Sequence, residues 1–138
     1  MNFLSDTQFI TAAANIATLL FAVVIVLQIL LAAGILPVSM AWGGRQPKLT
    51  PSLRFANIIA AILLGTFIFV IRYRAGLVGD GSIPAVIVVA SWVISAFMAV
   101  NTLGNLTSLS TREKVIFGPI TALLTLACLL ISASSPMN

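Results

Sequence analysis

The sequence predicts an all-α integral membrane protein, a four-helix bundle made of two transmembrane hairpins. Of its 138 residues, 60% are hydrophobic and only 7% are charged, whereas soluble domains carry about 25% charged residues. The apolar residues form four blocks, each close to the roughly 20 residues that cross the hydrocarbon core of a bilayer. The gaps between blocks are too short for a soluble domain, so residues 1–138 are expected to form one transmembrane domain.

The first predicted helix covers residues 9–36. Asp6 is expected at its start, and Gly34 with Pro37 closes its far end. No Lys or Arg precedes this apolar run, which is longer than the roughly 7–15 residues of a signal-peptide core. We therefore expect an uncleaved spanning helix.

A basic connector, Trp42–Arg54, leads to the second predicted helix at residues 53–73. Its paired glycines permit a tight turn, and Pro47 and Pro51 prevent helix propagation. Ser52 is expected to cap the second helix.

The third and fourth predicted helices cover residues 83–106 and 111–132. Pro84 lies at the start of the third helix. Proline is tolerated there because an N–H at this position would have no intrahelical partner. The spacing of Ser110 and Glu113 is typical of a capping box, in which the serine caps the fourth helix and the glutamate reaches back.

The net charge of +4 would suit a nucleic-acid-binding protein. However, all seven basic residues flank the predicted helices. Flanking cations determine topology and contact lipid headgroups, so no nucleic-acid partner is expected. The first and third connectors share one side of the membrane and carry most of the cations. They are Arg45, Lys48, Arg54, Arg112 and Lys114, against Arg72 and Arg74 on the other side. The positive-inside rule predicts cytoplasmic connectors and external termini.

The chain lacks the residues that metal binding, histidine-based catalysis and proton-coupled export require. The chain has no histidine and a single cysteine, Cys128, so we expect no metal site, no cofactor and no histidine-based catalysis. The three acidic residues, Asp6, Asp80 and Glu113, lie at helix ends or in connectors. A proton-coupled exporter needs a carboxylate within the membrane, and no helix centre supplies one.

Uncharged polar side chains follow one face of each predicted helix. The candidates for a polar interior are Asn15, Asn57, Ser91, Ser95, Thr121 and Thr125. One interpretation is helix packing, in which such groups hydrogen-bond across helices at about 0.6–2 kcal/mol each. The other is a polar pathway or pocket for a small solute.

The two connectors on the predicted cytoplasmic side form a candidate functional or clasp surface. It comprises Trp42, Gly43, Gly44, Arg54, Asn101, Asn105 and Glu113. The two asparagines have several donors and acceptors each, which either satisfy the end of the third helix or face a ligand. Arg54 and Glu113 lie on the same membrane side, so they either form an interfacial ion pair or make no mutual contact.

Two stretches resemble a family of small four-span bacterial integral membrane proteins whose function is uncharacterised. The first is Ala41-Trp42-Gly43-Gly44 followed by residues 49–54, and the second is the Asn101–Pro119 segment. The chain departs from the family pattern at Thr50, which separates Leu49 from Pro51. The resemblance implies a bacterial four-helix membrane protein and no activity.

Three functional classes follow from these features. The leading hypothesis is an integral membrane protein without catalytic machinery, an accessory, assembly or structural subunit in a homo-oligomer or a larger membrane complex. The alternative is a small channel, carrier or lipophilic-ligand-binding protein that uses the asparagine-lined interior. The third, an enzyme acting on lipid headgroups through Glu113 and Arg54, has only one acid and no histidine to support it.

Overall fold

The computed structural model describes residues 2–135. Four long helices make up most of this segment: α1 (Thr7–Ala33), α2 (Pro51–Arg74), α3 (Ala85–Leu106) and α4 (Thr111–Ala133). Each is long and apolar enough to cross a membrane, and residues 2–135 contain no strand. The predicted fold class is therefore confirmed: the protein is an all-helical, multi-pass membrane bundle.

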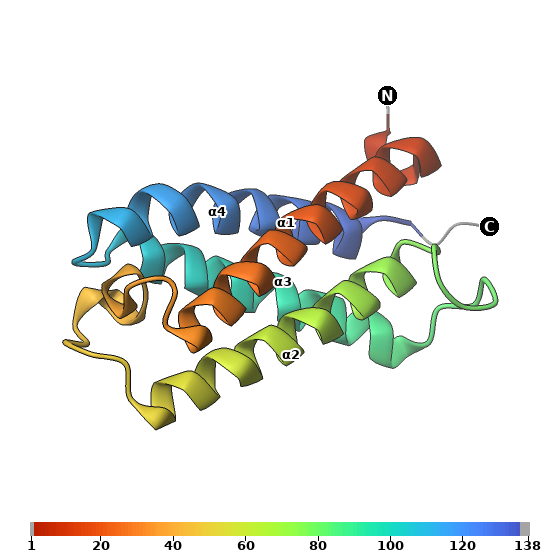
Figure 1. Ribbon diagram of the computed structural model, residues 1–138. Coiled ribbons are helices and arrows are strands. Elements are labelled where there is room, and N and C mark those ends of the chain that lie inside the picture. The colour runs from red at the N-terminus through yellow and green to blue at the C-terminus, as the bar shows by residue number, and fades with distance from the viewer. Residues whose placement is uncertain (1, 136–138) are drawn as a thin grey trace.

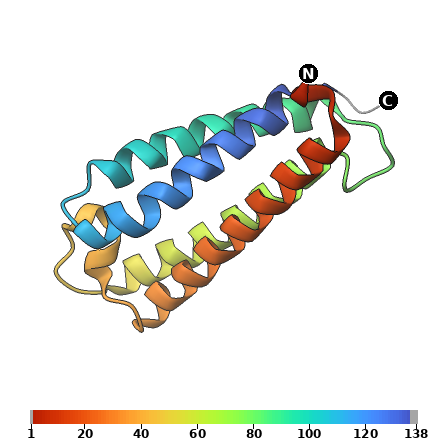
Figure 2. The ribbon, with the colours of Figure 1, turned by 90° about the horizontal axis from the view of Figure 1, so that it is seen from above.

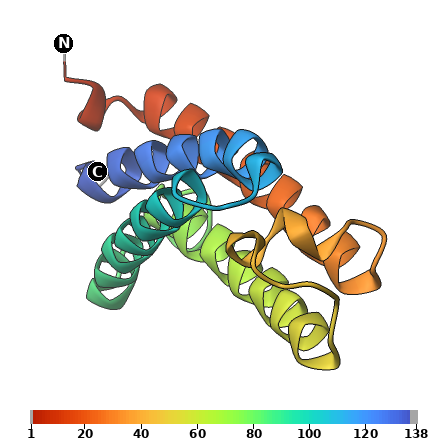
Figure 3. The ribbon, with the colours of Figure 1, turned by 90° about the vertical axis from the view of Figure 1, so that its left-hand side faces the viewer.

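The bundle consists of two antiparallel hairpins, α1–α2 and α3–α4, which lie side by side (Figures 1 and 2). The 34–50 and 107–110 connectors lie together at one end, which we call the connector end. The 75–84 turn and both described termini lie at the other, the terminal end (Figure 1). Contacts are extensive within each hairpin and much sparser between α2 and α3. Seen from the connector end, the start of α2 and the end of α3 lie apart (Figure 3).

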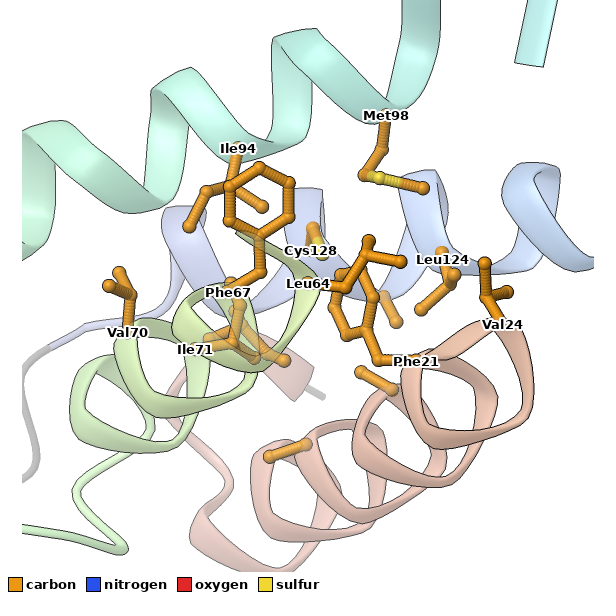
Figure 4. Packing of buried hydrophobic residues seen from close by; sticks show 14 of the residues in the cluster. Phe21, Val24, Leu64, Phe67, Val70, Ile71, Ile94, Met98, Leu124 and Cys128 are labelled. Carbon is orange, nitrogen blue, oxygen red and sulfur yellow. The ribbon is translucent and has the colours of Figure 1, made fainter. Parts of the chain in front are cut away.

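The packed core lies between the hairpins, in the middle of the bundle. All four helices contribute buried apolar side chains that point toward one another, among them Phe21, Phe67, Met98 and Cys128 (Figure 4). The Phe21 and Phe67 rings meet edge to face with their centroids 6.1 Å apart. Because lipid is as apolar as these side chains, close van der Waals packing and hydrogen bonds hold the helices together here.

The outward faces of the helices carry large apolar side chains that suit contact with lipid. Leu19, Phe55, Ile62 and Leu123 are exposed on α1, α2 and α4. In water such a surface would be an aggregation hazard. In a bilayer it is the expected partner of the acyl chains, so the protein contacts lipid around the bundle.

Local capping chemistry sets the helix ends. The Asp6 carboxylate accepts hydrogen bonds from the amides of Gln8 and Phe9, as predicted for the start of α1. At the other end α1 stops at Ala33, three residues short of the predicted bound. Gly34 has a φ of 78° and its amide bonds back to α1, and this left-handed conformation terminates a helix.

The predicted cap of α2 was wrong by two residues. Thr50, rather than Ser52, accepts the hydrogen bond from the Leu53 amide, at 3.2 Å. The helix begins at Pro51, where proline is favoured because the first helical N–H has no intrahelical partner. The Ser110 cap of α4 was predicted correctly, with its hydroxyl oxygen 3.2 Å from the Glu113 amide nitrogen.

Two arginines at the terminal end, Arg72 and Arg74, form hydrogen bonds with other helices of the bundle. Arg72 donates to the side chains of Asn15 and Thr18, at 3.0 and 3.2 Å. Arg74 is buried and donates to the Ser132 carbonyl at 3.0 Å and to the carbonyl and hydroxyl of Ser134. These bonds tie α2 to α1 and to the end of α4.

Candidate functional site

A cavity of about 560 Å³ opens at the connector end, between the two hairpins. Its volume lies in the range of about 300–1,000 Å³ typical of small-molecule sites. All four helices and the first connector contribute lining residues. Its polar and connector lining includes Gln28, Trp42, Asn57, Asn101, Asn105 and Glu113, and its other lining residues include Val24, Leu64, Phe97, Met98, Phe117 and Thr121. Seven of the thirteen residues predicted as candidates therefore line one cavity: Trp42, Gly43, Asn57, Asn101, Asn105, Glu113 and Thr121.

Asn57 is the most unusual residue in this lining. Its side chain is 1% exposed, and neither its Oδ1 nor its Nδ2 has a hydrogen-bond partner within residues 2–135. Gln28 of α1 lines the same cavity, and its Oε1 is also buried without a partner. An unmade hydrogen bond at a buried polar group costs about 1–3 kcal/mol, and each such group in a native structure calls for an explanation, such as strain, a bound water or ion, or a functional role.

The two asparagines of α3 present acceptors, and their bonds determine which way each amide is turned. Asn101 Nδ2 donates to the Phe97 carbonyl at 2.9 Å. Asn105 Nδ2 donates at 3.1 Å to the hydroxyl oxygen of Thr121, whose own hydrogen is given to the Phe117 carbonyl. Since only the amide nitrogen can donate, both Oδ1 atoms are left as free acceptors.

Glu113 is buried at the start of α4, 7% exposed, and borders the same cavity. The predicted capping box is modified here. The carboxylate does not reach back to the Ser110 amide; it accepts from the Ser108 hydroxyl, and the Ser110 amide donates to Ser108 Oγ at 3.0 Å. The serine therefore relays the contact, which leaves the second carboxylate oxygen, Oε1, without a hydrogen bond from residues 2–135.

The cavity lining changes in polarity with depth. At about 1.5 Å per residue, Asn57 lies about 9 Å along α2 from Pro51, and Leu64 lies about 20 Å along it. Gln28 lies about 8 Å from the end of α1, whereas Val24 lies about 14 Å from it. The polar groups are thus near the connector end, and the deeper walls are apolar.

The cavity opens sideways toward lipid, between α2 and α3. Leu63 of α2 and Phe97 of α3 line it and are also 41% and 42% exposed on the outer surface. Val100 and Gly104 of α3 line it and are exposed as well. This agrees with the sparse contact between α2 and α3 and with the separation of their ends in Figure 3.

A direct clasp joins the two connectors beside the cavity. The Leu109 amide donates to the Gly43 carbonyl at 3.1 Å. A Cβ added to Gly44 would lie 2.8 Å from the Ser110 nitrogen, so the backbones touch there. Trp42 precedes this contact with a φ of 58°, a left-handed conformation that costs about 1–2 kcal/mol for a residue with a side chain. Of the residues predicted for the clasp surface, Gly43 and Gly44 therefore make backbone contacts with the second connector.

Other predicted partners do not meet. Arg54 Nη1 donates to the Ala32 carbonyl at 3.2 Å, so it does not pair with Glu113, whose carboxylate binds Ser108. The assignment of Asn15 to the polar interior is wrong, because its side chain is exposed on α1 and accepts from Arg72. The position therefore lies on the outer surface of α1, beside Arg72 of α2, and outside the bundle interior.

The remaining predicted interior residues lie between α3 and α4, away from the cavity. Ser95 is buried and lies 3.1 Å from the Ser132 hydroxyl, and Ser91 is buried one turn away. Thr125 meets Thr102 at 3.0 Å. These groups are satisfied and hold the hairpin together, as the packing interpretation predicts.

No protein-family model, curated protein or solved structure matches the chain. The resemblance carried by the two connector stretches therefore stays a prediction. The geometry of the cavity supplies the argument about function. No cluster of metal-ligating side chains occurs within residues 2–135.

Sequence reasoning missed Gln28 and the relay serine Ser108. Gln28 is the only amide in the second half of α1, and a polar side chain inside an apolar span is a functional signal by itself. That signal was available in the sequence. The role of Ser108 was not, because it depends on how the 107–110 turn folds over the start of α4.

Proposed function

We propose that the protein binds a small amphipathic molecule drawn from the bilayer, in the cavity between its hairpins. The carrying observation is Asn57, a buried amide with both polar atoms unpartnered beside a cavity large enough for a ligand. A ligand with a polar end and a hydrocarbon body would complete those hydrogen bonds and cover the apolar walls. This role is a binding role without catalysis, and it develops the lipophilic-ligand alternative.

Access from lipid fits the lateral opening between α2 and α3. A molecule dissolved in the acyl chains would reach the deeper apolar walls without crossing an aqueous phase. Its polar end would then lie about 8–9 Å from the connector end, at the depth of Asn57 and Gln28.

Photoaffinity labelling tests this proposal. The purified protein in phosphatidylcholine nanodiscs is exposed to decanol carrying a diazirine, and labelled peptides are identified by mass spectrometry. Saturable labelling of the α2 and α3 segments that line the cavity, reduced at least about tenfold by Asn57→Leu, is expected. Thr66→Val is the matched control, because Thr66 is an exposed polar residue of α2 outside the cavity lining. Labelling spread evenly over the lipid-facing helix surfaces and unaffected by Asn57→Leu would contradict the proposal.

We propose as a second candidate that the protein is an accessory subunit of a larger membrane complex, in a bacterial inner membrane. Trp42 is 41% exposed on the connector surface, and exposed tryptophans are enriched where proteins associate. Recovery of a stoichiometric partner from mild detergent, lost in Trp42→Ala, would support this role. A lone monomer with no partner would contradict it.

We propose the predicted orientation, with the connectors in the cytoplasm. The support is that Arg72 and Arg74 are engaged with Asn15, Thr18, Ser132 and Ser134, whereas Arg45, Lys48, Arg112 and Lys114 are exposed. Only the connector end thus presents free cations among the described residues. In a Cys128→Ala background, a cysteine introduced at position 3 should react with an impermeant thiol reagent from outside the cell. Labelling from the cytoplasmic side alone would reverse the topology.

A further inference from the structure

The charge and hydrogen-bonding character of the cavity lining indicate which kind of polar group it accepts, and this inference rests on the proposed function. Among residues 2–135, Glu113 is the only charged residue that borders the cavity. No Lys or Arg lines it, although seven such residues occur in the chain. An anionic headgroup would therefore meet a carboxylate without a compensating cation, which strongly disfavours an acid or a phosphate ester.

The free polar atoms of the lining are mostly acceptors. Asn101 Oδ1 and Asn105 Oδ1 are free because their nitrogens donate to Phe97 and Thr121. Glu113 Oε1 is free because Ser108 occupies only Oε2. Gln28 Oε1 and Asn57 Oδ1 are buried without a donor from residues 2–135, and Asn57 Nδ2 is the one buried donor of the cavity lining that lacks an acceptor there. A ligand that donates several hydrogen bonds matches this set, and one that only accepts does not.

Aromatic rings add a second attraction for a cation. Trp42, Phe97 and Phe117 all line the cavity. A cation over such a ring gains about 0.5–2 kcal/mol, with tryptophan the strongest partner. Since the carboxylate and these rings border the same space, a positive charge is favoured there by both.

We propose that the ligand is a hydrophobic primary amine, bound as its ammonium ion. The ammonium group has three N–H donors and no acceptor, and it meets Glu113 and the free amide oxygens at the polar end of the cavity. The hydrocarbon body lies against Val24, Leu64 and Met98, deeper in the bundle. The Ser108 hydroxyl holds Glu113 in place by donating to its other oxygen.

Three competitors with the same hydrocarbon chain and different polar ends test the headgroup. Decylamine, decanol and decanoate compete with the diazirine probe on the protein in phosphatidylcholine nanodiscs. For the wild type we expect decylamine to displace the probe at a concentration at least about tenfold lower than decanol, and decanoate to be the weakest. This comparison needs no variant, so it holds even where a substitution impairs folding.

Variants of the carboxylate assign the preference to Glu113. Glu113→Gln should remove the advantage of decylamine over decanol, whereas Glu113→Asp should keep most of that advantage. Asp80→Asn is the matched control, because Asp80 is an exposed acid of the 75–84 turn outside the cavity lining, and it should change nothing.

The outcomes separate this inference from the proposed function. Equal competition by decylamine and decanol, or strongest competition by decanoate, would overturn the amine assignment while the cavity remains a ligand site. An amine advantage that persists in a folded Glu113→Gln variant would also overturn it, since adsorption of the amine to the bilayer would explain the result. Failure of all three to displace the probe would count against the proposed function itself.

Discussion

The amide of Leu109 donates a hydrogen bond to the carbonyl of Gly43 at 3.1 Å, and this backbone hydrogen bond joins the two hairpins at the connector end. It is reinforced one residue on, where Gly44 lies against the backbone of Ser110. Glu113, Ser108 and Trp42 surround this clasp, and all but Ser108 border the cavity. The clasp therefore holds the polar end of the cavity in shape while its lipid-facing side stays open.

The clasp predicts different costs for two adjacent glycine substitutions. Gly43 and Gly44 share a φ of 71°, but an added Cβ at Gly43 meets nothing closer than 4.0 Å, whereas at Gly44 it meets the Ser110 nitrogen at 2.8 Å. Gly43→Ala should cost about 1–2 kcal/mol of unfolding free energy from backbone strain. Gly44→Ala should cost about 1–3 kcal/mol more from the clash.

Unfolding by sodium dodecyl sulfate in mixed micelles, followed by circular dichroism, measures both glycine variants under one condition. Because the strain is common to the two, their difference isolates the contact with Ser110. Equal costs for the two variants would show that the connectors do not touch in the folded protein.

Arg74 is expected to stabilise the terminal end of the bundle. Arg74→Met removes the donors to the carbonyls of Ser132 and Ser134 and should lower the free energy of unfolding by about 1–3 kcal/mol. Arg74→Lys should recover only part of this, because a single ammonium cannot reproduce the planar fork of the guanidinium. Arg112→Met, at an exposed cation of α4, is the control with no expected loss.

The Arg74 variants can be compared by hydrogen exchange of the last turn of α4. Faster exchange confined to that turn in Arg74→Met is the expected pattern. Unchanged exchange would mean that these bonds do not hold the helix end.

Asn57 and Asn105 should respond in opposite directions when each is replaced by leucine. Asn57→Leu removes a buried amide with no partner, so the empty protein should gain about 1–2 kcal/mol of stability while losing its ligand. Asn105→Leu breaks the bond to Thr121 and should cost about 0.5–1.5 kcal/mol. Detergent unfolding without added ligand measures both, and a destabilised Asn57→Leu variant would show that the amide has a partner.

The Asp80 carboxyl at the terminal end is expected to titrate at an unusually low pH. Hydrogen bonds from the hydroxyl and amide of Ser82, at 2.7 and 3.0 Å, stabilise the charged form and hold the pKa of Asp80 below its ordinary value. Its contribution to stability is therefore present above the unfolded-state pKa and is lost as the pH falls through the folded-state value.

Ser82→Ala should raise the pKa of Asp80 toward the ordinary value, as measured by carbon-13 NMR of the carboxyl. The hydroxyl bond is the largest cause of the lowered pKa. Because the group is fully exposed, the global stability should barely change. An unshifted Asp80 titration in Ser82→Ala would assign the low pKa to the backbone bond instead.

The sequence by itself determined the number of spanning helices, their approximate limits and the caps at Asp6 and Ser110. These features depend on local properties: about 20 apolar residues cross the hydrocarbon core, and a cap acts on amides two or three residues away. The tertiary structure decided which polar groups face the interior. Asn15 and Asn57 look equivalent in sequence, yet one lies on the lipid-facing surface beside Arg72 and the other is sealed beside the cavity. The rotation of each helix about its axis and the separation of α2 from α3 make that difference, and both depend on contacts between residues far apart in the chain.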